Sequence, residues 1–151
     1  MVKAIAIGIV VCACGAAFTG PVLAQVRDAT YLGTFVCGKL PFAQDPVRAA
    51  IEVKISGNAG SYSRPVHMPL RDKIAGTETG TAAVEGDKIT LKGSWKGDKD
   101  SYDASYSGTF IRRSAQLTGT QTWTHEGKSY SRNCSGAIKR PLAIFLKKPK
   151  P

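Results

Sequence analysis

Apolar and polar residues alternate with a period of two along most of the chain, and helical spacing of apolar residues is almost absent. The clearest row has Ile89, Leu91 and Trp95 on one face, with Lys, Thr and Ser at the positions between and beside them. Such rows predict half-buried antiparallel strands that turn one face to a core and the other to water. Comparable rows recur elsewhere in the sequence, centred on Val53, Tyr106 and Leu117.

Short polar connections separate these rows. Several contain a glycine, such as Gly86, Gly97 and Gly127, whose freedom to take a positive φ suits short hairpins. Pro65 and Pro69 weaken the third strand, because proline cannot donate to a β-ladder. We expect about eight strands, near residues 29–37, 48–56, 61–68, 77–84, 88–96, 101–111, 115–124 and 128–139.

A motif of the form large-x-Gly-[Ser/Thr]-large recurs within the expected strands. Its glycine shares a face with the large residues and therefore points inward. An inward glycine relieves crowding where a sheet coils sharply or a neighbouring aromatic ring crosses it. The sequence therefore predicts an all-β fold, a small antiparallel up-and-down β-barrel closed by one disulfide. The copies of the motif lie at 31–35, 91–95, 106–110 and 117–121, with a looser copy at 134–138.

The beginning of the chain has a different character. Lys3 is followed by an apolar stretch over residues 4–18, and Val22-Leu23-Ala24 precedes Gln25. This is the pattern of a secretory signal peptide with an A-x-A-like cleavage site, and the apolar run is too short for a good membrane span. We expect the mature protein to be periplasmic or secreted, with no transmembrane segment after processing. The expected divisions are a signal peptide over 1–24, one barrel domain over 25–140 and a basic tail over 141–151.

The cysteines follow from this processing. Cys12 and Cys14 lie in the signal segment, so the mature chain would keep Cys37 and Cys134. An even pair in an oxidising compartment predicts a disulfide. The pair falls in the first and last expected strands, which are neighbours where an up-and-down barrel closes. Lipoprotein processing at Cys14 is an alternative to cleavage after Ala24.

Gly33-Thr34-Phe35 in the first expected strand, together with Arg132 in the last, resembles the calycin pattern of lipocalin and avidin-like barrels. In that family a first-strand Gly-x-Trp packs against a late Arg, and Phe35 stands here where Trp is usual. The resemblance implies that Phe35 packs against Arg132 where the barrel closes. It also favours a barrel that holds a ligand, without indicating which ligand.

Three polar residues, Glu78, Gln121 and Arg132, fall on faces that otherwise point inward. A buried charge needs a partner, so we expect Glu78 and Arg132 to pair inside the barrel or at its mouth. The pair would either anchor a ligand's carboxylate or amide, or form an internal salt bridge with no ligand. The candidate ligand-binding residues are Arg132, Glu78, Gln121, Trp95, Trp123 and Tyr106.

Aromatic residues are frequent on the inward faces. An eight-stranded barrel is either packed with side chains or holds one small ligand, and the sequence does not decide between the two. The aromatic set would therefore wall a pocket or fill the core. Its members are Tyr31, Phe35, Trp95, Tyr102, Tyr106, Phe110, Trp123 and Tyr130.

The chain carries a formal net charge of +10, from 21 Lys and Arg against 11 Asp and Glu. Cations gather at Arg112-Arg113, at Lys139-Arg140 and in the tail after Pro141. In an exported protein this charge would attract an anionic envelope polymer or an acidic protein, including an extracellular hydrolase that the chain inhibits. The alternative is a solvated surface that only confers solubility. Export and the lack of a recognition helix argue against nucleic acid as a partner.

The apolar residues 142–146 precede two further lysines, Lys147 and Lys148. This segment would either pack over one end of the barrel or contact a membrane surface.

Residues with catalytic potential are few. His67 and His125 lie far apart with no HxH, HExxH or Cys-x-x-Cys spacing near them, and no nucleophile elbow or phosphate loop is present. We therefore expect no metal, no cofactor and no enzymatic activity. The sequence favours a monomeric binding module that holds a small-molecule ligand inside a β-barrel. The alternative is a basic protein that binds an anionic partner on its outer surface.

Overall fold

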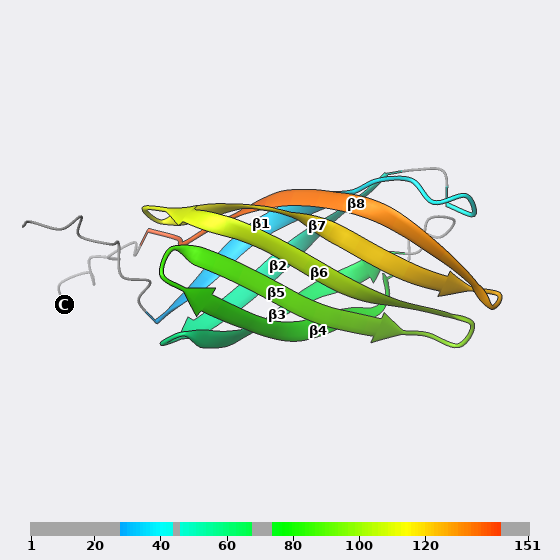
Figure 1. Cartoon of the computed structure of the whole chain (residues 1–151), viewed down its shortest axis with the longest axis horizontal. Coiled ribbons are helices and arrows are strands. Elements are labelled where there is room, and N and C mark those ends of the chain that lie inside the picture. The colour runs from blue at the N-terminus through cyan, green and yellow to red at the C-terminus, as the bar shows by residue number, and fades with distance from the viewer. Residues whose placement is uncertain (1–27, 44–45, 68–73, 143–151) are drawn as a thin grey trace, which may run out of the picture.

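The computed structural model describes residues 28–43, 46–67 and 74–142, and these residues form a closed eight-stranded barrel (Figure 1). Each strand pairs antiparallel with the next along the chain, and the last pairs with the first. The predicted fold class is confirmed. The described residues contain no helix that is long and apolar enough to cross a membrane. The strands are β1 (Ala29–Cys37), β2 (Val47–Ser56), β3 (Ala59–His67), β4 (Ile74–Glu85), β5 (Lys88–Lys96), β6 (Asp100–Ile111), β7 (Ser114–His125) and β8 (Lys128–Lys139).

The two ends of the barrel differ. At one end, called here the turn end, β2–β3, β4–β5 and β6–β7 are joined by tight turns in which Gly57, Gly86 and Arg112 have positive φ. At the other, the loop end, the β1–β2 and β3–β4 connections are longer, and β5–β6 and β7–β8 close in short hairpins. The turn end lies at the left of Figure 1 and the loop end at the right. The expected signal peptide and most of the tail lie outside the described residues.

Burial alternates along every strand, as the sequence pattern predicted. In β5, Ile89, Leu91 and Trp95 are buried, while Lys88 and Lys92 are exposed. The strand bounds fall within a few residues of those expected, and the third strand runs through its proline. Pro65 lies opposite Thr77 of β4, and the register shifts one residue later, between Val66 and His67. A proline on the outward face of a strand can be accommodated next to such an irregularity.

The inward glycines lie where neighbouring strands approach too closely for a side chain. A Cβ at Gly33 would lie 1.9 Å from the carbonyl oxygen of Ala137 on β8. Gly80 and Gly93 leave room for the ring of Tyr62, which crosses the interior at that level. The recurrent motif therefore marks the sharp coiling that lets eight strands close.

The disulfide joins the two strands of the closing seam. Cys37 and Cys134 are direct cross-strand partners of β1 and β8, with an S–S distance of 2.05 Å. The predicted disulfide is therefore present in the structure.

The interior is packed rather than hollow. Most inward side chains of the described strands are buried, including the aromatic rings of Phe35, Tyr106 and Trp123. Two shallow grooves, of about 280 and 390 Å³, lie on the outside of the described barrel. One lies over β5–β7 and the other over β7–β8, and Thr120 lines both. A ligand inside the barrel would therefore compete for space with these buried side chains.

Candidate functional site

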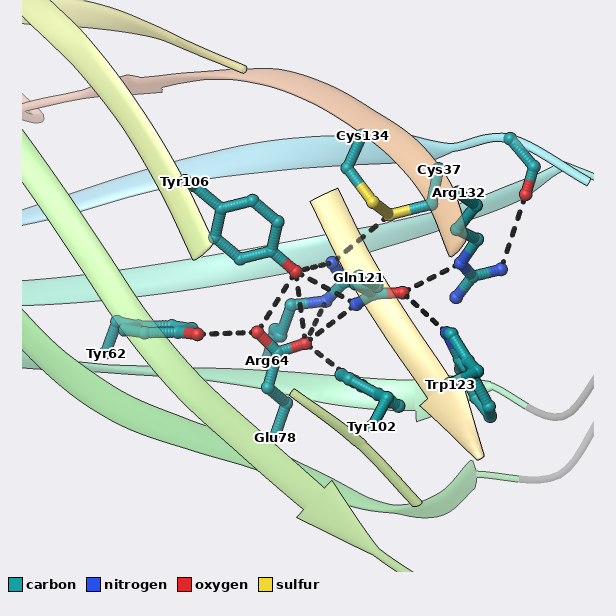
Figure 2. Close-up of a disulfide and its surroundings, with 11 residues drawn as sticks. Cys37, Tyr62, Arg64, Glu78, Tyr102, Tyr106, Gln121, Trp123, Arg132 and Cys134 are labelled. Atoms are coloured by element: carbon teal, nitrogen blue, oxygen red, sulfur yellow. Dashed lines mark hydrogen bonds and ion pairs between the residues drawn. A yellow bond between two sulfur atoms is a disulfide. The ribbon is translucent and has the colours of Figure 1, made fainter. Parts of the chain in front are cut away.

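A network of polar side chains occupies the middle of the barrel, and Glu78 of β4 lies at its centre (Figure 2). The Glu78 side chain is fully buried, yet both carboxylate oxygens are well supplied with donors. The Tyr62 hydroxyl donates to Oε1 at 2.7 Å, and the Tyr102 hydroxyl donates to Oε2 at 2.6 Å. The Tyr106 hydroxyl also donates to Oε1, at 3.1 Å. These bonds replace the water that the carboxylate loses on burial.

The counter-ion of Glu78 is Arg64, which the sequence reasoning missed. Arg64 lies directly opposite Glu78 on β3, its side chain is 1% exposed, and its Nε is 3.5 Å from Glu78 Oε2. That approach is close enough for an ion pair but lacks hydrogen-bond geometry, so Nε is the one buried side-chain nitrogen without a hydrogen bond in the described chain. Arg64 Nη1 donates to the Tyr106 hydroxyl at 3.2 Å and approaches the Cys37 sulfur at 3.5 Å. The alternation of Tyr62, Arg64 and Val66 could have revealed the inward position of Arg64.

Gln121 of β7 connects the centre of the network to Arg132. Gln121 Nε2 donates to Glu78 Oε2 at 3.1 Å and to the Tyr106 hydroxyl at 2.9 Å. Its Oε1 accepts from Arg132 Nε at 2.7 Å and from the Trp123 indole nitrogen at 3.2 Å. The expected direct pair of Glu78 with Arg132 is therefore wrong: the amide of Gln121 stands between them (Figure 2).

Arg132 of β8 is a buried cation with no carboxylate partner among the described residues. It is 5% exposed, and its guanidinium lies 5.0 Å from the ring centre of Trp123. Besides the bond to Gln121, Nη1 makes a long contact of 3.4 Å to the carbonyl oxygen of Gly38. Burial and, to a lesser degree, the nearby charge of Arg64 lower the pKa of Arg132 to about 10, although the negative charge of Glu78 acts in the opposite direction. The described interior thus holds two arginines and one carboxylate.

The packing implied by the calycin resemblance is not the one observed. Arg132 lies over Trp123, whereas the guanidinium over the Phe35 ring belongs to Arg64, at 5.9 Å. A first-strand aromatic ring does meet an arginine, but the arginine comes from β3 rather than from the last strand.

The structure brings all six candidate ligand-binding residues into one connected group. The polar members join through the bonds of Gln121. Trp95 of β5 lies beside Trp123 of β7, with ring centres 5.9 Å apart. Tyr102 is on β6, the strand between them, and its ring centre is 4.4 Å from that of Trp123. Each of the six residues is at least nine-tenths buried. They form one core, in which Trp95 and Trp123 lie nearest the loop end and Arg132 lies just inside it.

Residues 38–43, called here the cover segment, lie over that end. The segment begins with a bond from Gly38 N to Asn133 O and turns back on itself through paired bonds between Leu40 and Ala43. Both Leu40 and Ala43 are buried. The cover segment therefore packs onto the barrel mouth.

Phe42 of the cover segment sits in a box of aromatic rings. Its ring stacks on His125 at 4.1 Å and meets Tyr130 and Trp123 edge-on at 5.2 and 6.0 Å. His125 Nδ1 is in turn held by Asp100 Oδ1 at 2.5 Å. The box lies next to Arg132, because Arg132 contacts both Trp123 and the first residue of the cover segment. Sequence reasoning missed Phe42, which follows Pro41 in a connection without strand alternation.

The tyrosines of the network are donors rather than bases. Burial raises the pKa of Tyr62, Tyr102 and Tyr106, and the negative charge of Glu78 raises each further. Their hydroxyl groups therefore stay protonated and keep donating to the carboxylate. The described part of the chain contains no group of three or more side chains suited to hold a metal ion.

A comparison with models of known protein families found no match, and a comparison with curated proteins found none either. The function is therefore inferred from the geometry of the barrel and its buried network.

Proposed function

We propose that the protein is an exported, non-enzymatic binding module that holds one small anionic ligand at the loop end, with Arg132 as the anchor. The expected signal peptide over residues 1–24 and the Cys37–Cys134 disulfide support a periplasmic or secreted location, where disulfides persist. The ligand class is a carboxylate or similar anion attached to an aromatic or apolar body.

The unpartnered charge of Arg132 carries the proposal. Burying a cation is costly unless an anion or several hydrogen bonds compensate it, and Arg64 already pairs with Glu78. Arg132 has a bond to the neutral Gln121, a long contact to Gly38 and the face of Trp123. An incoming anion would supply the missing negative charge and would replace the weak contact to Gly38.

The box around Phe42 supplies the apolar half of the site. His125, Tyr130 and Trp123 already hold one aromatic ring, so they can hold another of similar size. In this proposal the ligand takes the place of Phe42 and the cover segment moves aside. A ligand of this kind needs no empty cavity in the free protein.

Binding of anilinonaphthalene sulfonate, an aromatic anion whose fluorescence rises in apolar sites, tests the proposal. We expect Phe42→Ala to bind the probe more tightly, because no ring then competes for the box. Arg132→Met should weaken binding roughly 10- to 100-fold, the usual effect of losing a bond to a charged group. The double variant should bind more weakly than Phe42→Ala by a similar factor, because it has the open box but lacks the anchor.

Arg112→Met serves as the matched control, since it removes an exposed cation at the turn end. Near-ultraviolet circular dichroism establishes that each variant keeps its packed aromatic core. Unchanged probe affinity in a folded Arg132→Met protein would overturn the proposal, as would an equal loss in Arg112→Met.

A second candidate function is the binding of an anionic envelope polymer or an acidic protein through the outer surface. The observation that favours it is the group of cations at the turn end, formed by the exposed Arg112, Arg113 and Lys139 and the partly buried Arg140. Affinity of this kind falls steeply with added salt, whereas a bond inside the covered mouth responds much less. Titration with polyglutamate at increasing salt concentration distinguishes the two sites.

A further inference from the structure

A row of outward side chains crosses four strands at the turn end. Leu32 of β1 pairs with Lys139 of β8, Lys139 pairs with Ser114 of β7, and Ser114 pairs with Ile111 of β6. Leu32 is 48% exposed and Ile111 is 69% exposed. Neighbouring strands are about 4.8 Å apart. The row is therefore about 15 Å long, with Leu32 at one end, Ile111 at the other and Lys139 between them.

Cations continue beyond this row onto the rim of the barrel. Arg112 and Arg113 form the exposed β6–β7 turn, at the left of Figure 1. Arg140 lies against that turn, because its backbone nitrogen donates to Arg113 O at 2.8 Å. Arg113 Nη2 donates to the carbonyl oxygen of Pro141 at 2.6 Å and so holds the chain where it leaves β8. We call Arg112, Arg113, Lys139 and Arg140 the basic rim.

Leu142 follows directly and is 69% exposed. We expect residues 142–146 either to pack over one end of the barrel or to contact a membrane surface; apart from Leu142, this segment lies outside the described residues. The sequence beyond Leu142 continues with Ala, Ile, Phe and Leu and then two lysines. The basic rim thus stands beside Leu32, Ile111 and Leu142 and at the start of a further apolar and basic stretch.

A single exposed leucine on a soluble protein needs no explanation. Exposed apolar side chains combined with several cations are different, because this combination matches the two layers of an anionic membrane surface. Lipid headgroups attract Lys and Arg, and the acyl boundary accepts apolar side chains. A soluble polyanion would be matched by the cations alone and would leave the apolar side chains unused.

The turn end also carries the acidic residues Asp28, Glu85 and Asp87. Asp87 lies in the β4–β5 turn, where its backbone oxygen accepts from Phe110 N, and Asp28 precedes β1 and accepts from Gly57 N. None of these three carboxylates forms a salt bridge with a cation of the basic rim. The cations of the basic rim are therefore available to an external anion.

We propose that the turn end docks on an anionic phospholipid surface, with the basic rim at the headgroups and Ile111 and Leu142 inserted beside it. The inference rests on the second candidate function, since it names the partner of that same surface. It leaves the loop end, with Arg132 and the cover segment, facing away from the membrane.

Co-sedimentation of the purified protein with vesicles tests the proposal. We expect binding to vesicles of phosphatidylglycerol and phosphatidylcholine, and none to phosphatidylcholine alone. Arg112→Gln with Lys139→Gln should weaken binding roughly 30-fold, the effect of about 1 kcal/mol for each cation at an anionic surface. Ile111→Ser with Leu142→Ser should also weaken vesicle binding, while leaving the affinity for polyglutamate unchanged.

Matched controls come from elsewhere on the barrel. Ile74→Ser removes an exposed apolar side chain at the loop end, and Lys92→Gln with Lys96→Gln removes two exposed cations of β5; both should bind vesicles as the native protein does. One outcome would overturn only the lipid inference: the Ile111/Leu142 variant binds vesicles as the native protein does, while the Arg112/Lys139 variant no longer binds polyglutamate. The surface would then recognise polyanions, and the second candidate function would stand. If the Arg112/Lys139 variant still binds both vesicles and polyglutamate with native affinity, both the inference and the second candidate function are overturned.

Discussion

Glu78 and Arg132 share the interior of the barrel without forming an ion pair. Each meets its own cross-strand neighbour: Glu78 lies opposite Arg64 in the β3–β4 pair, and Arg132 lies opposite Gln121 in the β7–β8 pair. Two hairpins thus bring one charged pair and one amide–guanidinium pair into the same core. The consequence is an asymmetric interior in which one arginine is compensated by a carboxylate and the other is not.

This asymmetry predicts opposite effects for the two buried arginines. Arg64→Met should destabilise the fold by about 3–5 kcal/mol, because Glu78 would remain buried without its counter-ion. Arg132→Met should change the free energy of unfolding by less than about 1 kcal/mol, since no carboxylate loses a partner and Trp123 still donates to Gln121. Urea unfolding measures both values. Equal losses would show that Arg132 also compensates Glu78.

The glycine positions predict a second contrast. Gly33→Ala should cost more than about 3 kcal/mol, because its Cβ would lie 1.9 Å from the backbone of β8 and the seam would have to open. Gly38→Ala should be nearly neutral, since the nearest atom to its Cβ would be at an ordinary 3.5 Å. Thermal unfolding of the two variants checks the contrast. Tolerance of alanine at Gly33 would contradict the account of barrel coiling.

Much of this fold could be predicted from the sequence, because alternating burial and glycine turns are local signals. The interior pairing could not be predicted in the same way. The pairing depends on strand register. Pro65 makes the third strand uncertain from sequence alone, so the inward position of Arg64 is not evident and Arg132 is the partner that the sequence suggests for Glu78. Gln121 and Arg132 were both recognised as inward, but only the β7–β8 register shows that they face each other.

The cover segment was hidden from sequence reasoning for a different reason. Phe42 lies in an irregular connection, where no periodicity indicates which way a side chain points. Its contacts with Trp123, His125 and Tyr130 come from β7 and β8, which are distant in sequence and reach the end of β1 only because the barrel closes with β8 beside β1. Whether the interior is filled or hollow likewise depended on shear and strand tilt, which alternation does not encode.

The buried tyrosines predict a loss of stability at alkaline pH. In the unfolded chain tyrosine ionises near pH 10, whereas burial and Glu78 raise the pKa of Tyr62, Tyr102 and Tyr106 in the folded protein. Above about pH 10 the unfolded state therefore holds fewer protons, and the free energy of unfolding falls by about 1.4 kcal/mol per pH unit for each tyrosine. Arg132 has the opposite effect, because its pKa is lowered to about 10 in the folded protein. Above that pH the unfolded state keeps the arginine proton that the folded state loses, which offsets the effect of one tyrosine.

Tyrosinate absorbance of the native protein measures this effect directly. The three buried hydroxyls should ionise only as the barrel unfolds, together with the loss of aromatic circular dichroism. Gradual ionisation near pH 10 in a barrel that stays folded would contradict their role as donors to Glu78.

The disulfide predicts a strong redox dependence of stability. Replacing Cys37 and Cys134 by serine should lower the free energy of unfolding by about 2–5 kcal/mol, because the bond closes a loop with a sequence separation of 97. A reducing agent should shift the urea midpoint of the native protein and leave that of the double variant unchanged. An unchanged midpoint under full reduction would mean that the seam is held by its β-ladder alone.

The central claim is that Arg132, covered by Phe42, binds one small anion. Native mass spectrometry of the purified protein with anilinonaphthalene sulfonate tests it most directly. The account predicts one bound probe per chain in the native protein, more complete occupancy in Phe42→Ala, and much lower occupancy in a folded Arg132→Met protein at the same probe concentration. Equal occupancy with and without the Arg132 guanidinium, or no bound probe even in Phe42→Ala, would contradict it.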